Sequence, residues 1–182
     1  MFPELPDVLA RRSGGAVTVC TIGFKGRNTA AIVREFDPSI AETQLGGAPT
    51  NVVILTGVND QVQRRGPRSY VTAIKALMDF FPAATGQVIS APLVNTETPL
   101  NFRSSARRVV LGLLHPEVNA QYRKALSEAL PAGEIIDFSE FSAWYTAEPA
   151  RYEADGIHIT RPTYREYGAF IGERVNLAAH AR

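Results

Sequence analysis

Two short segments carry side chains suited to proton transfer and to hydrogen-bond donation. The first is Gly57-Val58-Asn59-Asp60, which directly follows an apolar run, and the second is Asp155-Gly156-Ile157-His158. Histidine is the side chain whose pKa lies near neutrality, so an imidazole here can take up and release a proton. Asp155, three residues before His158, can accept from the other ring nitrogen and fix the tautomer. Both segments also have the composition of simple turns, with His158 as a surface imidazole.

The other candidates for chemistry are weaker. His115 precedes Pro116 at a predicted helix start, where it reads as a capping or loop residue, and His180 lies in the terminal tail. The single cysteine, Cys20, excludes an internal disulfide and a cysteine-rich metal site. Because no cluster of His, Asp, Glu or Cys has ligand spacing, we expect neither a metal ion nor another cofactor.

Strands and helices are predicted to alternate along the chain. Apolar and β-branched runs predict strands at residues 16–22, 51–56, 87–94 and 134–138. Periodic apolar residues and capping signals, among them Asn28, predict helices at residues 4–12, 28–36, 71–81, 116–130 and 161–179. The Gly and Pro residues between these elements predict an irregular segment with at most one helical turn at 37–50, and loops at 58–67 and 144–153.

This alternation predicts βαβ units, and therefore a parallel sheet with helices on both faces. The fold class is α/β, in one domain over residues 1–182, because a chain of this length holds one ordinary core but not two. The uninterrupted apolar run from Asn51 to Thr56 predicts a strand buried on both faces. Ligands of such sheets bind beyond the carboxyl ends of the strands, which is where Gly57 to Asp60 lies.

The bulk composition excludes several classes of partner. The chain is 45% apolar and 20% charged with a formal net charge of +1, as in a soluble globular protein. Its Lys and Arg residues are scattered, so we expect no nucleic-acid partner. No run approaches the roughly 20 apolar residues of a membrane-spanning helix. Met1 to Glu4 lacks the basic and apolar start of a signal peptide, which favours a cytoplasmic location.

Three segments, in their order along the chain, resemble the SGNH or GDSL esterase superfamily. Gly23 to Thr29 resembles the family's second sequence block, with Gly26 in the position of its oxyanion glycine. Leu55 to Asp60 is similar to the G-x-N-D block and gives Asn59 the second oxyanion role. Asp155 to His158 matches the D-x-x-H block, which precedes a terminal amphipathic helix. The resemblance spans nearly the whole chain and implies a flavodoxin-like three-layer α/β/α sandwich.

The activity that this resemblance implies is that of a serine-type carboxylic ester hydrolase. Donors from Gly26 and Asn59 would stabilise a tetrahedral oxyanion, each by about 3 kcal/mol. His158 would act as general base and then as general acid, with Asp155 as the group that orients it. Asp60 is expected to be structural. The breadth of the family suggests a small acyl ester or an acetylated carbohydrate as the substrate.

The family's first block, a buried strand that ends in G-D-S, has no counterpart in this sequence. Pro6 to Ala10 already resembles the helix that follows this block in the family. The resemblance places the strand in the middle of the sheet, between residues 16–22 and 51–56, so we expect exposed backbone groups and apolar surface there. No serine of the chain follows a strand as the family's serine does; Ser104 and Ser105 lie in a long loop and are interpreted as loop residues.

Three explanations stay open. In the first, an upstream segment or a separate polypeptide supplies the strand and the serine, and the assembled protein is an esterase. In the second, the chain is a non-catalytic binding or structural module within a larger assembly. In the third, a different nucleophile operates. Loss of a serine nucleophile costs on the order of a millionfold in kcat, so the chain alone is expected to be nearly inert. A complementing chain or an oligomer is expected to cover the exposed sheet.

Overall fold

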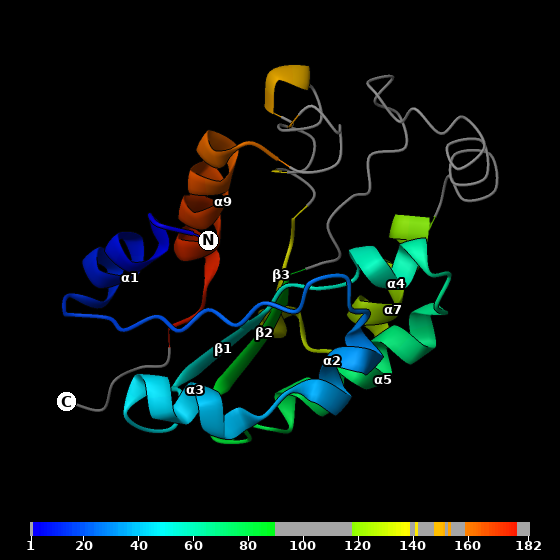
Figure 1. Cartoon of the computed structure of the whole chain (residues 1–182), viewed down its shortest axis with the longest axis horizontal. Helices are drawn as coiled ribbons and strands as arrows, with labels where there is room; N and C mark the ends of the chain where they lie inside the picture. Colours follow the sequence, from blue (N-terminus) through cyan, green and yellow to red (C-terminus); the bar gives the residue numbers. More distant parts are fainter. Residues whose placement is uncertain are drawn as a thin grey trace.

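A parallel sheet between two groups of helices forms the centre of the protein (Figure 1). The computed structural model describes residues 2–89, 118–138, 141, 148–151, 153 and 159–177. The sheet has the order β1-β2-β3, formed by Asn51–Ile54, Thr85–Ile89 and Ile135–Ile136. Both pairings are parallel, with Val53 opposite Gln87 and Ile89 opposite Ile136. The predicted α/β class with a parallel sheet is therefore confirmed.

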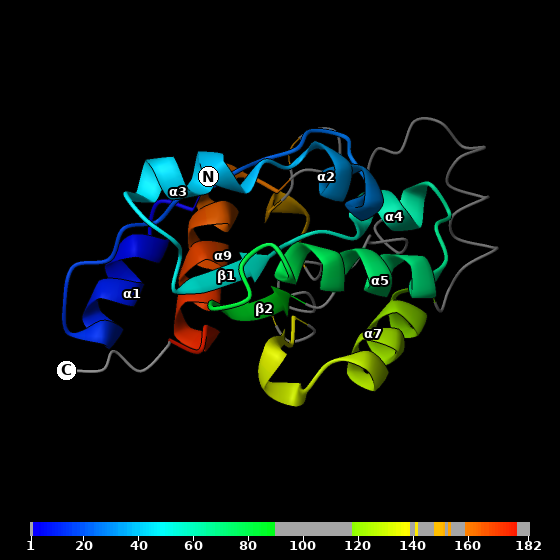
Figure 2. The same ribbon diagram turned by 90° about the horizontal axis from the view of Figure 1, so that it is seen from below.

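One face of the sheet is covered by the two helices that connect its strands. α5 (Pro67–Met78) links β1 to β2, and α7 (Val118–Ala129) precedes β3. Their apolar residues recur at helical spacing and pack with Ile54 and Val88 of the sheet; Tyr70, Ile74 and Leu126 are fully buried there. α2 (Thr29–Glu35) lies beside α5, on the side away from α7 (Figure 2). The predicted helices at 28–36, 71–81 and 116–130 are thus confirmed within the described residues, although the second begins earlier, at Pro67, and ends at Met78.

The other face is covered by the first and last helices, α1 (Leu5–Ser13) and α9 (Arg161–Arg174), which lie together in both views (Figures 1 and 2). They approach so closely that a Cβ built on Gly172 would lie 2.7 Å from Cγ1 of Val8. Tyr167 and Ile171 of α9 pack on Ile89 and Ile136 of the sheet. Two segments from opposite ends of the sequence therefore form one layer.

The last helix ends earlier than the sequence predicts. Arg12 Nη1 donates to the backbone oxygens of Gly172 and, at 2.8 Å, of Val175. Val175 has an extended backbone, and Asn176 N donates to the Oε1 atom of buried Gln87 at 2.7 Å. These bonds draw the chain away from the helix axis toward β2, so α9 stops at Arg174 while the predicted helix continued to residue 179. Residues 178–179 lie outside the described residues.

Residues 16–22 do not form a strand of the described sheet, so this prediction was wrong. The segment follows α1 and carries no assigned strand, although Val17 and Val19 pack against the core under α1 and α9. β-branched residues favour an extended chain, but a strand also needs a neighbour with which to share backbone hydrogen bonds. In the described sheet, β1 is an edge strand and pairs with β2 alone.

The burial of β1 also differs from the expectation. Ile54 is 8% exposed and faces the core under α5 and α7, whereas Val53 and Leu55 are 37% and 36% exposed. Successive side chains of a strand point to opposite faces, so Val53 and Leu55 point to the face that α1 and α9 cover over the other strands. That layer packs on Ile89 and Ile136 and leaves this side of β1 open. The predicted burial of this strand on both faces was wrong.

Two segments predicted as irregular contain helices. α3 spans Pro38–Leu45 within the predicted irregular segment, and α4 spans Val58–Val62 within a predicted loop. α3 has a local cause, because Asp37 Oδ1 accepts from Ser39 N at 3.0 Å and from Ser39 Oγ at 2.7 Å, and Pro38 occupies the first helical position. These hydrogen bonds also lower the pKa of Asp37.

The remaining predicted elements are shorter in the structure than expected or lie partly outside the described residues. β2 begins at Thr85, and residues 90–94 of that predicted strand lie outside the described part. The predicted strand at 134–138 is reduced to β3, preceded by the 3₁₀ helix η1 (Ala132–Glu134). A second 3₁₀ helix, η2 (Pro149–Arg151), lies in the predicted loop at 144–153. A search of the described residues finds no helix of the length and apolar character needed to cross a membrane.

Candidate functional site

Gly26 lies in the turn that leads into α2. Its φ is +72°, in the left-handed region that glycine adopts without steric cost, and Arg27 N donates to Phe24 O at 3.3 Å across the turn. Asn28 then caps the helix, because its Oδ1 atom accepts from Ala31 N at 2.9 Å. The predicted capping role of Asn28 is confirmed, and the cap fixes the direction in which the Gly26 turn enters the helix.

Asn59 lies in the first turn of α4, directly beyond the carboxyl end of β1. Its Nδ2 atom donates to Arg27 O at 3.0 Å, so this amide contacts the peptide group next to Gly26. An asparagine amide carries two hydrogens, and this bond uses one of them. Within the described residues no other hydrogen bond of Nδ2 is found, so the second hydrogen can donate to a bound molecule. The structure thus brings the turn of Gly26 and the side chain of Asn59 together.

Gln63, immediately after α4, makes a second connection between the same two turns. Its Oε1 atom accepts from Asn28 Nδ2, and its Nε2 atom lies 3.5 Å from Gly26 O. The carbonyls of two consecutive residues, Gly26 and Arg27, are therefore both held by side chains from the segment after β1. This arrangement restricts how far the Gly26 turn can move relative to Asn59.

A buried polar cluster lies behind this connection. Asp60 Oδ2 accepts from Thr29 N at 2.9 Å and from Thr29 Oγ1 at 2.7 Å, and both residues are at most 1% exposed. Thr29 Oγ1 is also 2.9 Å from Thr56 Oγ1, at the end of the apolar run that contains β1. Thr29 is the first residue of α2, so the carboxylate of Asp60 meets the amino end of that helix, where an anion is favoured.

Two tyrosines close the inner side of this cluster. Tyr70 donates to Thr56 O at 3.4 Å, and Tyr122 donates to Arg65 O. Burial, and secondarily the charge of Asp60, raises the pKa of Tyr122 to about 12. The same causes raise the pKa of Tyr70 further. Both phenols therefore keep their protons at neutral pH and act there as hydrogen-bond donors.

The predicted acid and base, Asp155 and His158, lie outside the described residues. The described residues on either side of this segment are joined by hydrogen bonds. Thr160 caps α9, and its backbone N–H donates to Arg151 O at 2.8 Å. Thr163 Oγ1 donates to the same oxygen at 3.1 Å, which ties the start of α9 to η2. The start of α9 lies at the end of the molecule toward which β1 runs (Figure 1).

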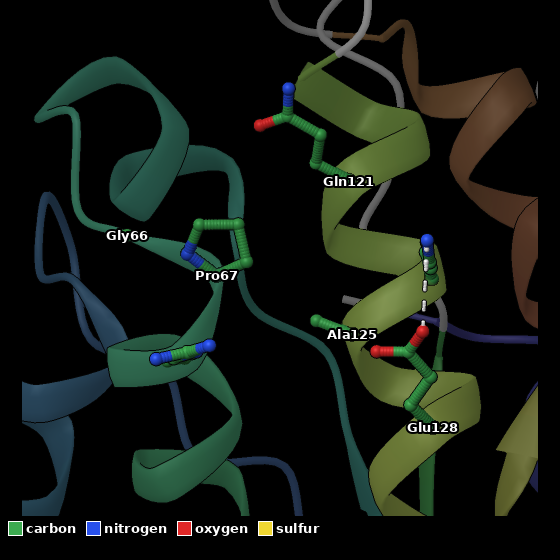
Figure 3. A pocket seen from close by; sticks show the side chains of 7 residues that line it. Gly66, Pro67, Gln121, Ala125 and Glu128 are labelled. Carbon is green, nitrogen blue, oxygen red and sulfur yellow. Dashed lines mark ion pairs between the residues drawn. The ribbon is translucent and has the colours of Figure 1, made fainter.

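A hollow of about 440 Å³ lies between α5 and α7, away from these turns (Figure 3). It is lined by Gly66, Pro67, Arg68, Gln121, Lys124, Ala125 and Glu128. Lys124 Nζ and Glu128 Oε1 form an ion pair of 3.8 Å between largely exposed side chains, a kind of pair that contributes little to stability. Neither Gly26 nor Asn59 lines this hollow. Among the described residues no group of three His, Cys, Asp or Glu side chains is placed to hold a metal ion.

Sequence reasoning identified Gly26, Asn28 and Asn59 but missed two residues that connect their turns. Thr29 and Gln63 pair with residues 31 to 37 positions away in the sequence. Such pairs leave no local spacing to detect, and a single threonine after a capping asparagine is ordinary at a helix start. The signal available in the sequence was limited to Asp60, whose position beside Asn59 suggested a loop-holding role.

Comparison with known proteins gives one positive result. The model of the GDSL-like Lipase/Acylhydrolase family matches residues 1–166, which include both turns and all three strands described above. The comparisons with curated proteins and with solved structures gave no match.

Proposed function

The chain belongs to the GDSL-like lipase/acylhydrolase family, and we propose that it serves in the hydrolysis of carboxylic esters, with Gly26 and Asn59 as the two donors of an oxyanion hole. The observation that carries the proposal is the hydrogen bond from Asn59 Nδ2 to Arg27 O, which holds the amide beside the Gly26 turn. Stabilising an oxyanion requires donors that are already in place before charge develops. Two turns joined by several side chains meet that requirement.

In the proposed reaction a serine hydroxyl attacks the carbonyl carbon of the ester while His158 takes the hydroxyl proton. The resulting oxyanion accepts from Gly26 N–H and from the second Nδ2 hydrogen of Asn59, and each donor contributes about 3 kcal/mol. His158 then returns the proton to the leaving alcohol as the acyl-enzyme forms. Water, deprotonated by His158, releases the acid in the second half of the cycle. Asp155 accepts from the other ring nitrogen and stabilises the imidazolium.

The proposed nucleophile is a serine on a strand that pairs with the free edge of β1, from an upstream segment or from a separate polypeptide. Two features support this: β1 is paired on one side only, and Val53 and Leu55 are exposed. The serines within the described residues, Ser13, Ser39, Ser69 and Ser127, all lie in helices and not at the carboxyl end of a strand. Ser90, Ser104, Ser105, Ser139 and Ser142 lie outside the described residues.

The proposed substrate is a small acyl ester or an O-acetyl group on a carbohydrate. This choice rests on the breadth of chemistry in the family, since a fold or family alone does not define a substrate. A series of p-nitrophenyl esters with increasing acyl length discriminates a short-chain esterase, whose kcat/KM falls with chain length, from a lipase, whose kcat/KM rises.

The test of the proposed function is labelling of the protein with a fluorophosphonate probe, followed by mass spectrometry to identify the labelled residue, together with hydrolysis of p-nitrophenyl acetate. In the assembled protein, with the strand that supplies the serine present, we expect labelling of one serine and turnover that disappears in His158→Ala and persists in the matched control His115→Ala. Turnover retained in His158→Ala would remove this histidine from the mechanism. Labelling of Ser90, Ser104 or Ser105 would support a different nucleophile within this chain.

A non-catalytic role in a larger assembly is the second candidate, and the open side of β1 favours it independently of any chemistry. Exposed edge strands with apolar side chains are surfaces on which other chains pair. This candidate requires stable association of the chain and no probe labelling in any assembled form. Labelling of the intact protein contradicts it.

A further inference from the structure

We propose that Asp60 is a positioning residue. Its buried carboxylate locks the amino end of α2 to α4 and so keeps the Gly26 turn beside the side chain of Asn59. The effect of this positioning on catalysis rests on the proposed function. The lock itself is a property of the fold and can be measured without any hydrolysis.

The geometry of the lock is specific to Thr29. One oxygen of Asp60, Oδ2, receives both the backbone N–H of Thr29 at 2.9 Å and its hydroxyl at 2.7 Å. The hydroxyl of Thr29 is in turn 2.9 Å from Thr56 Oγ1, so the end of the β1 run joins the same cluster. On the other side, Asp60 O accepts from Arg65 N at 2.8 Å, which fixes the residue within its own segment.

The carboxylate of Asp60 lies in the interior of the described part of the chain. Asp60 is 1% exposed, and in the described part of the chain no ion pair involves it. A buried charge of this kind is tolerated only when hydrogen bonds and local dipoles replace its hydration. The two donors of Thr29 and the amino end of α2 supply that replacement. The donors of Thr29 therefore stabilise the buried carboxylate of Asp60, and the carboxylate in turn holds Thr29 in position.

The connection to the candidate site is short. Thr29 is two residues from Arg27, whose carbonyl receives the Asn59 amide, and three residues from Gly26. If α2 shifts away from Asp60, Arg27 O moves away from Asn59 Nδ2, and the two proposed donors lose their common direction. The bond between Asn28 and Gln63 joins the same turns and is partly buried, whereas both bonds between Asp60 and Thr29 are fully buried.

Asp37 offers a matched control for a simple capping role. Its carboxylate also accepts a backbone N–H and a hydroxyl from one residue, Ser39, but within its own segment and at the surface. Asp37→Asn therefore changes the same chemistry at the start of α3 without touching the Gly26 and Asn59 turns.

The test is two-dimensional NMR of the full chain with amide hydrogen exchange, comparing Asp60→Asn, Thr29→Val and Asp37→Asn with the parent protein. The reporters are the Arg27 amide and the Asn59 side-chain amide, neither of which bonds to Asp60. We expect exchange of the Arg27 amide to accelerate by about tenfold or more in Asp60→Asn, as for loss of a hydrogen bond to a charged group. We also expect the two Nδ2 hydrogens of Asn59 to approach the shifts of a free amide.

Asp37→Asn should change neither reporter. Thr29→Val removes the bonds of the hydroxyl to Asp60 and Thr56 but keeps the backbone N–H bond, and should show the same effect in a weaker form. Thr29→Ser should keep the parent values, and these two variants also test the proposal if Asp60→Asn does not fold. Unchanged Arg27 and Asn59 signals in folded Asp60→Asn or Thr29→Val, with or without lower global stability, would show that the carboxylate is only structural. Because these readouts need no turnover, they decide whether Asp60 forms this lock independently of whether the assembled protein hydrolyses esters.

Discussion

The side-chain amide of Asn59 donates to the backbone oxygen of Arg27 at 3.0 Å, across 32 residues of sequence. This bond joins the turn after β1 to the turn before α2. It uses one of the two amide hydrogens of Asn59. The same contact thus both connects two turns and orients a donor, so its structural and chemical effects have to be separated by experiment.

In the assembled protein that contains the proposed serine, we expect Asn59→Ala to lower kcat for ester hydrolysis by about 10²- to 10³-fold, as for loss of one oxyanion donor, with little change in KM. The free energy of unfolding should fall by less than about 1 kcal/mol, because Arg27 O lies near solvent and can accept from water. Steady-state kinetics and urea unfolding measure the two quantities. Asn51→Ala, at the other end of β1, is the control, and an equal loss of kcat in both variants would argue against a specific role of Asn59.

The packing of α1 on α9 makes a second, independent prediction. A Cβ at Gly172 would lie 2.7 Å from Val8 Cγ1, a distance that requires movement of one helix. We expect Gly172→Ala to lower the free energy of unfolding by about 1–3 kcal/mol, the usual cost of overpacking a core. Gly47→Ala, where a Cβ meets no atom within 4 Å, should leave it nearly unchanged. Equal stabilities of the two variants in urea would show that the helices separate easily.

The raised pKa of Tyr122 predicts a loss of stability at alkaline pH. A tyrosine in the unfolded chain titrates near pH 10, whereas Tyr122 in the folded protein titrates at about 12. Between these values the unfolded state binds fewer protons than the folded state, so the free energy of unfolding falls as pH rises. The contribution is complete below pH 10 and is lost through about pH 12.

Tyr122→Phe removes this titration together with the hydrogen bond to Arg65 O. We expect it to cost about 1 kcal/mol at neutral pH, and to make the decline between pH 10 and 12 shallower than in the parent protein. Urea titrations at a series of pH values measure both effects, and other alkaline groups cancel in the comparison. Parallel curves for the two proteins would mean that Tyr122 titrates normally.

The sequence predicted those elements whose causes are local. Asn28 predicted the start of α2, and the helical spacing of the apolar residues Tyr70, Ile74 and Leu77 predicted the buried side of α5. α3 was missed although Asp37 and Pro38 carry its start signal, because the surrounding Gly and Pro residues outweighed them. The carboxyl end of β1 was correctly expected to lie beside Asn59.

What the sequence could not show depends on partners distant in the chain. The apolar run that contains β1 reads as a fully buried strand, but burial also depends on how far the layer of α1 and α9 extends over the sheet. The run at 16–22 has strand composition, yet pairing requires an adjacent backbone. The contact of Thr29 with Asp60 also joins residues that are distant in the sequence, so no local spacing predicts it.

The open side of β1 carries the last prediction. Val53 of β1 and Leu55, the residue that follows this strand, are 37% and 36% exposed, and β1 is paired on one side only in the described sheet. Such an edge offers both backbone hydrogen bonds and apolar surface to an incoming strand, and natural proteins block such pairing with edge lysines. We therefore expect a Val53→Lys, Leu55→Lys double variant to reduce association of the chain, with copies of itself or with a complementing strand, as measured by sedimentation velocity over a range of concentrations.

Ile40→Lys is the matched control, because Ile40 is 47% exposed on α3 and equally apolar but belongs to no strand. A comparable reduction in both variants would indicate non-specific hydrophobic association and not edge pairing. A parent protein that stays monomeric at every concentration and binds no added strand would contradict a partner at this edge. Association that the double variant loses and Ile40→Lys keeps would locate the partner on β1, next to the turn that carries Asn59.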